Sequence, residues 1–438
     1  MHDVCVVGLG YVGLPTACSF ARSGLDTIGV DVRPHVVAAV KRGRSHLTEA
    51  GLGDEVRKAV RSGKLHATGD IRRAVSGSAA VIVAVQTPYQ DGRVVLDFLK
   101  AACAQVAESI RPGTVVILES TVPAGTCERA ILPLLEAGGR RDGREFYFAY
   151  CPERIAPGNS IQEFVSNDRL IGAAGHRSFE KAEALLKKAV RGRLLRTSIL
   201  NAEAAKLVEN TARDVYVAFA NDLARVAWRE GWDAREVIRL ANTHPRVKIL
   251  SPGPGVGGPC LTKDPYLLLE GLRSEDPGVG LTIRTARGVN DGMHLEVVRL
   301  LEDAGPPGRR SKVAVLGTAY KPEVGDPRSS PSERVVKELL RRGYDVWTYD
   351  PFTEEGFGAR RARSLDEAVR GASCAVILVA HKAFSSLDMD SLAARMSPDP
   401  VFIDAVGVVP PGVKGKKYRL RRLGDGSSRM ESKSALEA

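Results

Sequence analysis

Residues 3–13 read Asp-Val-Cys-Val-Val-Gly-Leu-Gly-Tyr-Val-Gly, an apolar strand followed by a Gly-x-Gly-x-x-Gly turn, and a helical stretch continues to Ala21. Gly8 permits a tight turn, Gly10 lets the backbone approach a pyrophosphate, and Gly13 lets the helix pack on the strand. The N-terminus of that helix would face the phosphates. The stretch therefore predicts a Rossmann-type domain that binds a dinucleotide.

The next predicted strand, residues 26–31, ends in Asp31. A carboxylate at this point holds a ribose 2′-hydroxyl and repels a 2′-phosphate, which favours NAD over NADP. Arg33 follows closely and weakens that preference, because a guanidinium attracts a 2′-phosphate. We predict NAD as the cofactor.

Polar residues follow three further predicted strands, at residues 80–85, 114–119 and 146–150. They are Thr87, Thr121 and Glu153. In a doubly wound parallel sheet, ligands bind at the carboxyl ends of the strands, so these positions favour a functional role. Ordinary turn and capping roles are the alternative for the threonines.

A helix is predicted from near Asn201 to about Glu230, closed by Gly231. Lys206 and Asn210 are four residues apart on it, so both lie on one face. A cation and an amide donor projecting together would stabilise a developing oxyanion. Surface charge is the alternative.

A second glycine-rich stretch, residues 252–265, reads Pro-Gly-Pro-Gly-Val-Gly-Gly-Pro-Cys-Leu-Thr-Lys-Asp-Pro. Such a loop brings backbone N–H groups against a ligand and presents one thiol, Cys260, to it. Lys263 and Asp264 place a cation and a carboxylate nearby. The stretch indicates a cysteine nucleophile, with a small buried cysteine as the alternative.

The chain repeats its opening pattern after residue 311. Strands are predicted at residues 312–317, 346–350, 375–380 and 401–404, which indicates a second Rossmann-like domain. Its turn at Gly317 lacks the full Gly-x-Gly-x-x-Gly pattern, so we expect it to bind something other than a dinucleotide pyrophosphate in the usual pose. Residues 303–311 are predicted to be a linker, and residues 424–438 a disordered tail.

The 438 residues suffice for two or three domains. Seven scattered cysteines lack the spacing of a disulfide framework or a metal site, so we predict reduced thiols, a cytoplasmic location and no metal. The sequence holds no apolar run long enough to span a membrane, and we predict no signal peptide before the first strand. The net charge of +11 suits a polyanionic nucleotide sugar, with solvated surface charge as the alternative; no nucleic-acid motif accompanies it.

Six motifs, in order over residues 1 to about 422, resemble the UDP-glucose/GDP-mannose dehydrogenase family. They are residues 8–15, 119–126, 152–158, 206–210, 252–265 and 321–331. The resemblance implies an α/β fold of two Rossmann-like doubly wound domains joined by a central helical domain that makes a homodimer. The implied parts are an NAD domain at residues 1–199, the central domain at 200–302, and a nucleotide-sugar domain at 311–423.

The resemblance also implies NAD-dependent oxidation of a UDP-sugar C6 alcohol to a carboxylate in two hydride transfers, as in polysaccharide biosynthesis. Cys260 would form a thiohemiacetal and then a thioester, which water hydrolyses. Lys206 and Asn210 match the oxyanion pair, Asp264 would assist the base and position water with Thr121, and Glu153 matches an acid/base glutamate.

The complete predicted sets are larger. The predicted NAD contacts are Gly8, Gly10, Tyr11, Val12, Gly13, Asp31, Arg33, Thr87, Thr121, Lys263 and Arg328. The predicted substrate contacts are Glu153, Arg154, Lys206, Asn210, Arg213, His244, Arg246, Gly257 and Lys321, with Arg328 also in a segment expected to meet the substrate.

The subfamily motifs point in two directions. Residues 152–158, 210–214 and 241–247 resemble the N-acetylhexosamine branch, as does Pro157 where a UDP-glucose enzyme carries a second glutamate. Pro259 and Lys263 depart from that branch, and the lysine resembles UDP-glucose enzymes. We favour UDP-N-acetyl-D-mannosamine as substrate, with UDP-N-acetylglucosamine and UDP-glucose as alternatives.

Two other classes of function remain open from the sequence. One is an NAD-linked hydroxyacid or sugar-acid dehydrogenase that performs a single oxidation without a covalent step; the cysteine loop argues against it. The other is a catalytically silent nucleotide-sugar sensor, which the complete set of Cys260, Lys206, Asn210 and Asp264 argues against.

Overall fold

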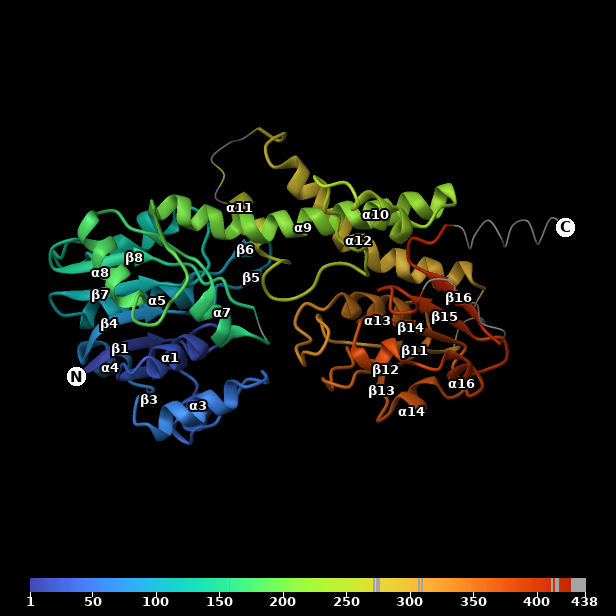
Figure 1. Ribbon diagram of the computed structural model, residues 1–438, viewed down its shortest axis with the longest axis horizontal. Helices are drawn as coiled ribbons and strands as arrows, with labels where there is room; N and C mark the ends of the chain where they lie inside the picture. The colour runs from blue at the N-terminus through green and yellow to red at the C-terminus, as the bar shows by residue number, and fades with distance from the viewer. Residues whose placement is uncertain are drawn as a thin grey trace. The chain divides into compact units, whose positions relative to one another are not determined.

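The computed structural model describes all residues except 157, 271, 273–275, 306–307, 309, 411–412, 414–416 and 427–438. The chain divides into two compact units. Unit 1 comprises residues 1–209 and 266–273, and unit 2 comprises residues 210–265 and 274–438. Figure 1 labels many of the helices and strands of both units. The three-part division expected from the sequence stays a prediction.

Unit 1 is built on an eight-stranded sheet in the order β10-β9-β8-β7-β4-β1-β2-β3. The strands are β1 (His2–Val7), β2 (Thr27–Val30), β3 (Leu65–Thr68), β4 (Ser78–Val83), β7 (Thr114–Leu118), β8 (Phe146–Tyr150), β9 (Arg169–Gly172) and β10 (Leu194–Thr197). The order from β3 to β8 is the doubly wound arrangement that the glycine turn predicts. β9 is antiparallel to β8, and β10 is parallel to β9. A separate antiparallel hairpin joins β5 (Tyr89–Gln90) to β6 (Arg93–Val94).

Alternate residues of each strand face opposite sides of the sheet, and in this sheet both sets are apolar. Helices therefore cover both faces of the sheet. In β1, Val4 and Val6 belong to one core, and Cys5 and Val7 to the other. The first core takes α1 (Gly13–Arg22), α2 (Pro34–Lys41), α3 (Leu52–Arg61), α7 (Ser160–Ser166) and α8 (His176–Leu186). The second takes α4 (Ile71–Ser76), α5 (Asp97–Ser109), the π-helix η1 (Cys127–Ile131) and α6 (Leu132–Leu135).

Unit 2 carries a six-stranded parallel sheet in the order β13-β12-β11-β14-β15-β16. The strands are β11 (Lys312–Leu316), β12 (Asp345–Tyr349), β13 (Arg360–Arg361), β14 (Cys374–Ile377), β15 (Val401–Asp404) and β16 (Arg419–Arg422). Its helices are α13 (Pro331–Arg341), α14 (Leu365–Val369), α15 (Lys382–Ser385) and α16 (Met389–Ala393). The strand order is again that of a doubly wound fold, which confirms two Rossmann-like sheets.

Two long helices lie between these sheets along the chain, α9 (Ile199–Glu230), which continues from unit 1 into unit 2, and α12 (Leu281–Asp303). Two short helices, α10 (Ala234–Ala241) and α11 (Asp264–Glu270), lie between them in the sequence. Within unit 2, buried polar side chains join α9 to α12. Asn221 Nδ2 donates to Asn290 Oδ1 at 2.9 Å, and Arg287 Nη1 donates to Asp214 Oδ1 at 2.6 Å. The sequence pattern predicts α9, whereas α12 was not predicted.

Residues 424–426 were predicted to begin a disordered tail, but they pack within unit 2. Asp425 forms an antiparallel bridge with Asp233, and Gly426 N–H donates to the Trp232 carbonyl oxygen at 2.9 Å. A Cβ on Gly426 would lie 1.9 Å from the Ala227 carbonyl oxygen, so this close packing needs glycine. Residues 427–438 lie outside the described residues. No helix in the described part of the chain is long and apolar enough to cross a membrane.

Candidate active site

The glycine turn between β1 and α1 has the backbone that a pyrophosphate needs. Gly8 has a φ of 93°, a left-handed value that favours glycine. A Cβ on Gly13 would lie 1.8 Å from the Gly8 carbonyl oxygen, whereas a Cβ on Gly10 would meet no atom within 4 Å. The N-cap residue of α1, Val12, makes no side-chain cap, and Tyr11 beside it is half-buried. The open space at Gly10, next to the helix N-terminus, fits a dinucleotide pyrophosphate.

Asp31 directly follows β2, where the sequence predicts a ribose contact. Its Oδ2 accepts a hydrogen bond from Leu9 N–H at 3.0 Å, and its Oδ1 accepts one from Arg33 N–H at 2.9 Å. Arg33 also binds the carboxylate through Nε, 2.9 Å from Oδ1, and Nη2, 3.0 Å from Oδ2. Burial raises the pKa of Asp31, but the bonds from Arg33 and Leu9 outweigh it, so the pKa lies below its usual value. The Asp31 carboxylate is therefore charged and ion-paired with Arg33 at the position where the sequence predicts a ribose contact.

The loops that follow β4 and β7 are hydrogen-bonded to each other. Thr87 Oγ1 donates to the Thr121 carbonyl oxygen at 2.6 Å, and Ser120 Oγ donates to the Val85 carbonyl oxygen at 2.7 Å. Thr87 is buried and Thr121 is half-buried. The structure therefore brings these two predicted residues together at the carboxyl edge of the first sheet.

Glu203, on the first part of α9, fixes the loop after β7. Its carboxylate accepts Gly125 N–H at 2.5 Å and Cys127 N–H at 2.8 Å. The side chain is fully buried, and burial raises its pKa although these hydrogen bonds oppose the shift. Glu203 was not predicted from the sequence. Because it lies one helical turn before Lys206 on α9, its spacing could have indicated a side chain on the same face of the helix.

Lys206 and Glu153, both predicted to be catalytic, form a buried ion pair. Lys206 Nζ lies 3.1 Å from Glu153 Oε1, and the two residues are 5% and 7% exposed. Glu153 Oε2 also accepts Ile155 N–H at 2.9 Å. Arg154 binds Glu209 of α9, with Nη2 2.7 Å from Oε1. The segment after β8 is thus attached to α9 at two points, a contact that the sequence did not predict.

A second buried ion pair lies close to Glu153 and contacts the residue before it. Arg169 Nη2 is 3.4 Å from Glu119 Oε1, and these side chains are 1% and 0% exposed. Thr16 Oγ1 donates to Glu119 Oε2 at 3.0 Å, and Arg169 Nη1 donates to the Pro152 carbonyl oxygen at 3.3 Å. Burial raises the pKa of Glu119, and the Arg169 charge opposes it. The pair joins α1, β9 and the ends of β7 and β8, and so supports the residue before Glu153.

Cys260 differs in exposure from the other six cysteines, all of which the structure describes. Cys260 is half-buried, and the other six are buried. Burial raises the pKa of Cys5, Cys18 and Cys103 to about 12, which keeps these thiols protonated at neutral pH. Cys260 is therefore the thiol placed to react with a ligand.

Four predicted residues form a connected group around the turn that follows Cys260. The Cys260 carbonyl oxygen accepts the N–H groups of Lys263 and Asp264 at 3.0 and 2.9 Å. Asn210 Nδ2 donates to Asp264 Oδ2 at 2.5 Å, and Lys263 Nζ lies 2.9 Å from Asp264 Oδ1. Asp264 is 1% exposed. Asp264 thus orients both Asn210 and Lys263, the latter predicted as a cofactor contact.

The glycines before Cys260 permit a close approach to the second Rossmann-like fold within unit 2. A Cβ on Gly258, which has a φ of 89°, would lie 2.7 Å from the Tyr320 ring. A Cβ on Gly257 would lie 2.6 Å from Pro331 Cδ. Gly253 N–H also donates to Asn221 Oδ1 at 2.9 Å. The cysteine loop is therefore fitted between α9 and the segment at residues 320–331.

That segment carries the predicted ligand contacts Lys321 and Arg328, both exposed. Arg328 Nη2 lies 2.6 Å from Asp326 Oδ2, and the Asp326 carbonyl oxygen accepts Tyr320 N–H at 2.9 Å. Glu323 N–H donates to Nδ1 of a buried histidine, described next, at 3.0 Å. The polar segment is therefore held in one conformation beside the cysteine loop.

His381 and Asp350 accept hydrogen bonds from the backbone of this segment and of the residues just before it. His381 is fully buried, and its Nε2 lies 3.1 Å from Asp350 Oδ2. Because Nδ1 accepts a backbone hydrogen bond, Nε2 carries the proton and donates to Asp350. The same carboxylate accepts the N–H groups of residues 318–319 at 2.7 and 2.9 Å. In the first sheet the matching carboxylate, Asp31, likewise accepts hydrogen bonds from the protein.

Three further predicted substrate residues, Arg213, His244 and Arg246, are exposed. Arg246 N–H donates to His244 Nδ1 at 3.4 Å. Pro157, where the expected second glutamate is missing, lies outside the described residues.

Comparison with known proteins gives matches along most of the chain. Residues 2–190, 200–292 and 314–411 match the NAD binding domain, the central domain and the UDP binding domain of the UDP-glucose/GDP-mannose dehydrogenase family. The UDP-N-acetyl-D-mannosamine dehydrogenase of Pyrococcus horikoshii is 39% identical over 426 residues, which cover 96% of this chain and 99% of that protein.

Solved structures agree with this match. The structure of UDP-D-ManNAc dehydrogenase from Pyrococcus horikoshii has a TM-score of 0.90 and 38% identity, with 97% of this chain and 100% of that chain covered. A UDP-glucose dehydrogenase from Pyrobaculum islandicum has a TM-score of 0.84 and 28% identity, with 96% and 97% covered.

Proposed function

Because the chain belongs to the UDP-glucose/GDP-mannose dehydrogenase family, we propose that it oxidises the C6 alcohol of UDP-N-acetyl-D-mannosamine to the carboxylate. NAD, held at the turn from Gly8 to Gly13 and by Asp31, would supply the hydride acceptor for both oxidations. The observation that carries the proposal is the half-buried Cys260 beside the Asn210–Asp264–Lys263 group. A single alcohol-to-ketone oxidation has no use for a thiol in that setting.

In the proposed chemistry, the first oxidation converts the alcohol to an aldehyde. The Cys260 sulfur then bonds to the aldehyde carbon, and its proton goes to the new hydroxyl, which gives a thiohemiacetal. The second oxidation leaves a thioester, and water displaces the thiol to release the uronate. An aldehyde that is bonded to the protein cannot diffuse away.

Lys206 and Asn210 support the proposed oxyanion role by position and by charge. They lie four positions apart on α9, and each is oriented by a carboxylate: Lys206 by Glu153 and Asn210 by Asp264. Donors that are fixed before reaction stabilise developing charge without reorganisation. We place Asp264 as the group that assists proton removal and, with Thr121, positions water.

The substrate proposal rests on the named relatives. The Pyrococcus enzyme, named for UDP-N-acetyl-D-mannosamine, is 39% identical, and the UDP-glucose dehydrogenase structure is 28% identical. UDP-glucose and UDP-N-acetylglucosamine are therefore not favoured. The product is an activated sugar acid, so we place the reaction in polysaccharide biosynthesis.

We propose a homodimer formed by α9 and a cytoplasmic location. Large apolar side chains on α9 are exposed, with Tyr216, Phe219 and Val226 at 55%, 54% and 41%. Apolar groups that recur at helical spacing on an exposed surface mark an interaction face. A catalytic thiol must stay reduced, which the cytoplasm provides.

One assay tests the function. The protein is incubated with NAD and, separately, UDP-N-acetyl-D-mannosamine, UDP-N-acetylglucosamine, UDP-glucose and GDP-mannose, and NADH and products are quantified. We expect the highest kcat/KM with UDP-N-acetyl-D-mannosamine and two NADH per uronate. One NADH per product would indicate a single oxidation, and binding without turnover would indicate a sensor; either result overturns the proposal.

A further inference from the structure

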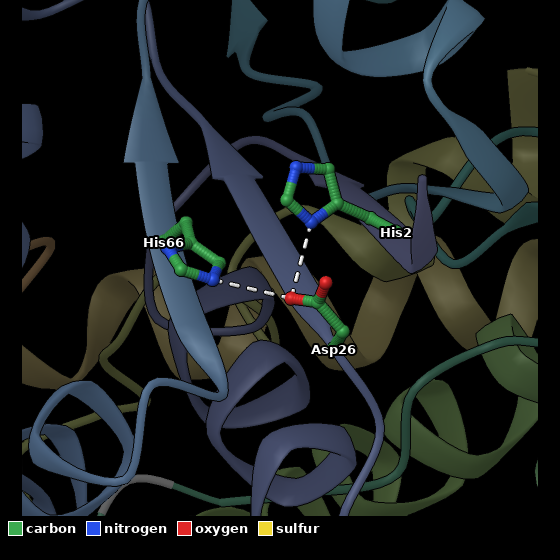
Figure 2. Close-up of side chains that lie close together, drawn as sticks. All are labelled: His2, Asp26 and His66. Atoms are coloured by element: carbon green, nitrogen blue, oxygen red, sulfur yellow. Dashed lines mark ion pairs between the residues drawn. The ribbon is translucent and has the colours of Figure 1, made fainter.

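Three side chains meet at the amino-terminal edge of the first sheet. His2 begins β1, Asp26 directly precedes β2, and His66 lies in β3. Figure 2 shows both imidazole rings turned toward the Asp26 carboxylate. His2 Nδ1 lies 3.1 Å from Asp26 Oδ1, and His66 Nε2 lies 3.2 Å from the same oxygen. One atom from each residue falls within 4.8 Å of the other two.

Both contacts are ion pairs when the imidazoles are protonated. Among the described residues, the buried atoms His2 Nδ1 and Asp26 Oδ1 make no hydrogen bond. A buried polar atom without a hydrogen bond costs free energy, and a metal ion bound by these two atoms, which lie 3.1 Å apart, would compensate for that cost. Ligands of one metal ion show this arrangement, because their lone pairs are directed at the ion and not at one another.

The distances fit a tetrahedral ion. With metal–ligand bonds of about 2.0–2.1 Å, tetrahedral ligand atoms lie roughly 3.3 Å apart. The two measured separations, 3.1 and 3.2 Å, are close to that value. The donor set of two imidazole nitrogens and one carboxylate oxygen suits first-row divalent ions such as Zn²⁺. His66 is 46% exposed and gives the ion a route from solvent.

We propose that His2, Asp26 and His66 bind a divalent transition-metal ion, with a water molecule completing the coordination. The ion would tie the amino-terminal ends of β1, β2 and β3 together, since these strands are neighbours in the sheet. Each β1 residue advances the chain by about 3.3 Å, and β1 runs from His2 to Val7 before the turn at Gly8. The site therefore lies at the opposite edge of the sheet from the proposed pyrophosphate site, and its role is structural.

The spacing of the three residues explains why the sequence did not predict a metal. Residues 2, 26 and 66 follow none of the short ligand spacings of known metal motifs. Only the parallel pairing of β1 with β2, and of β2 with β3, brings them together.

The test uses full-length, tag-free protein that carries Cys260→Ser, so that the reactive thiol does not capture the ion. After treatment with EDTA and its removal, Zn²⁺ is titrated by calorimetry, and the unfolding temperature is measured with and without Zn²⁺. We expect one Zn²⁺ per chain and a rise of roughly 5 °C at an excess of about a hundred times Kd. Asp26→Asn and His66→Gln should each weaken binding by more than about tenfold and remove the rise.

His176→Gln is the matched control. His176 Nε2 lies 3.1 Å from Glu180 Oε1, so it is a histidine–carboxylate pair without a third ligand, and its loss should leave Zn²⁺ binding unchanged. Circular dichroism and NAD affinity, both measured in EDTA, test whether each variant is folded. If Asp26→Asn fails to fold, the Zn²⁺ affinity of His66→Gln, a change at an exposed residue, tests the proposal alone. Absence of saturable Zn²⁺ binding in the parent, or equal binding by His66→Gln, overturns the proposal.

Discussion

Lys206 Nζ lies 3.1 Å from Glu153 Oε1, and both residues are less than a tenth exposed at 5% and 7%. Changing Lys206 alone would therefore leave the buried Glu153 carboxylate without this cation. Removing one partner of a buried pair typically costs about 3–5 kcal/mol of unfolding free energy. A substitution of Lys206 is therefore expected to change both kcat and the free energy of unfolding, so a second variant is needed to tell the two effects apart.

We expect Lys206→Ala to lower both kcat and stability. Loss of an oxyanion donor should reduce kcat by at least about a hundredfold, and urea unfolding should show the stability loss. The double variant Lys206→Ala/Glu153→Gln removes both charges and should recover much of the stability without recovering kcat. If the double variant regained activity as well, Lys206 would be a structural residue only.

Cys260→Ser should bind NAD and the UDP-sugar with affinities close to those of the parent and form no uronate, because an alkoxide is far harder to generate than a thiolate. Cys103→Ala, at a buried cysteine of α5, is the control and should retain turnover. Alkylation by iodoacetamide, mapped by mass spectrometry, should label Cys260 first. Uronate production by Cys260→Ser would exclude the covalent mechanism.

The cofactor preference should follow the Asp31–Arg33 pair. We expect kcat/KM to favour NAD over NADP by more than tenfold, about 1.4 kcal/mol. Arg33→Ala should widen the preference, because it removes a cation that both occupies Asp31 and attracts a 2′-phosphate. Asp31→Asn should narrow it, because Arg33 is then released. Equal kcat/KM values for the two cofactors in the parent would contradict the ribose contact.

Glu203→Ala should lower kcat through the loop that carries Thr121. The carboxylate is the hydrogen-bond acceptor for Gly125 N–H and Cys127 N–H, and their loss would leave buried donors unpaired. Glu203→Gln retains an acceptor oxygen and should recover part of kcat. A drop in stability with unchanged kcat in Glu203→Ala would limit the residue to a folding role.

Acid stability should depend on Asp350. Burial raises its pKa, but hydrogen bonds from His381 and from the N–H groups of residues 318, 319 and 352 outweigh it, so the pKa is below its usual value. A lowered folded-state pKa gives a stabilisation that is complete above the unfolded value, about 3.9, and is lost as pH falls through the folded value. On acidification below about pH 4, the parent should therefore lose more unfolding free energy than Asp350→Asn. Parallel stability curves would refute this assignment.

The sequence was most informative where chemistry depends on neighbouring residues. The Gly8–Gly13 turn and the Cys260 loop are local patterns, and their glycines adopt conformations or close contacts that a side chain would not permit. The ribose contact of Asp31, also read from a local pattern, stays a prediction. The two doubly wound sheets follow from the alternation of apolar strands and helices, and both strand orders agree with it.

The missed features depend on contacts between distant parts of the chain. Glu119 and Arg169 are 50 residues apart and become a buried pair only when α1, β7 and β9 assemble. Glu203 reads in sequence as an ordinary helix glutamate, and its two backbone donors lie 78 and 76 residues away. The periodicity of apolar residues indicates which face of a helix or strand is buried. It does not indicate which charged residues from distant parts of the chain will form a buried pair.

The packing of Gly257 and Gly258 against Tyr320 and Pro331 has a consequence for enzyme engineering. A cysteine loop from a relative with another sugar preference will fit only if its glycine positions match the shape of the segment at residues 320–331. Chimaeras designed to change the sugar should therefore exchange both segments as one module, and libraries should vary them jointly.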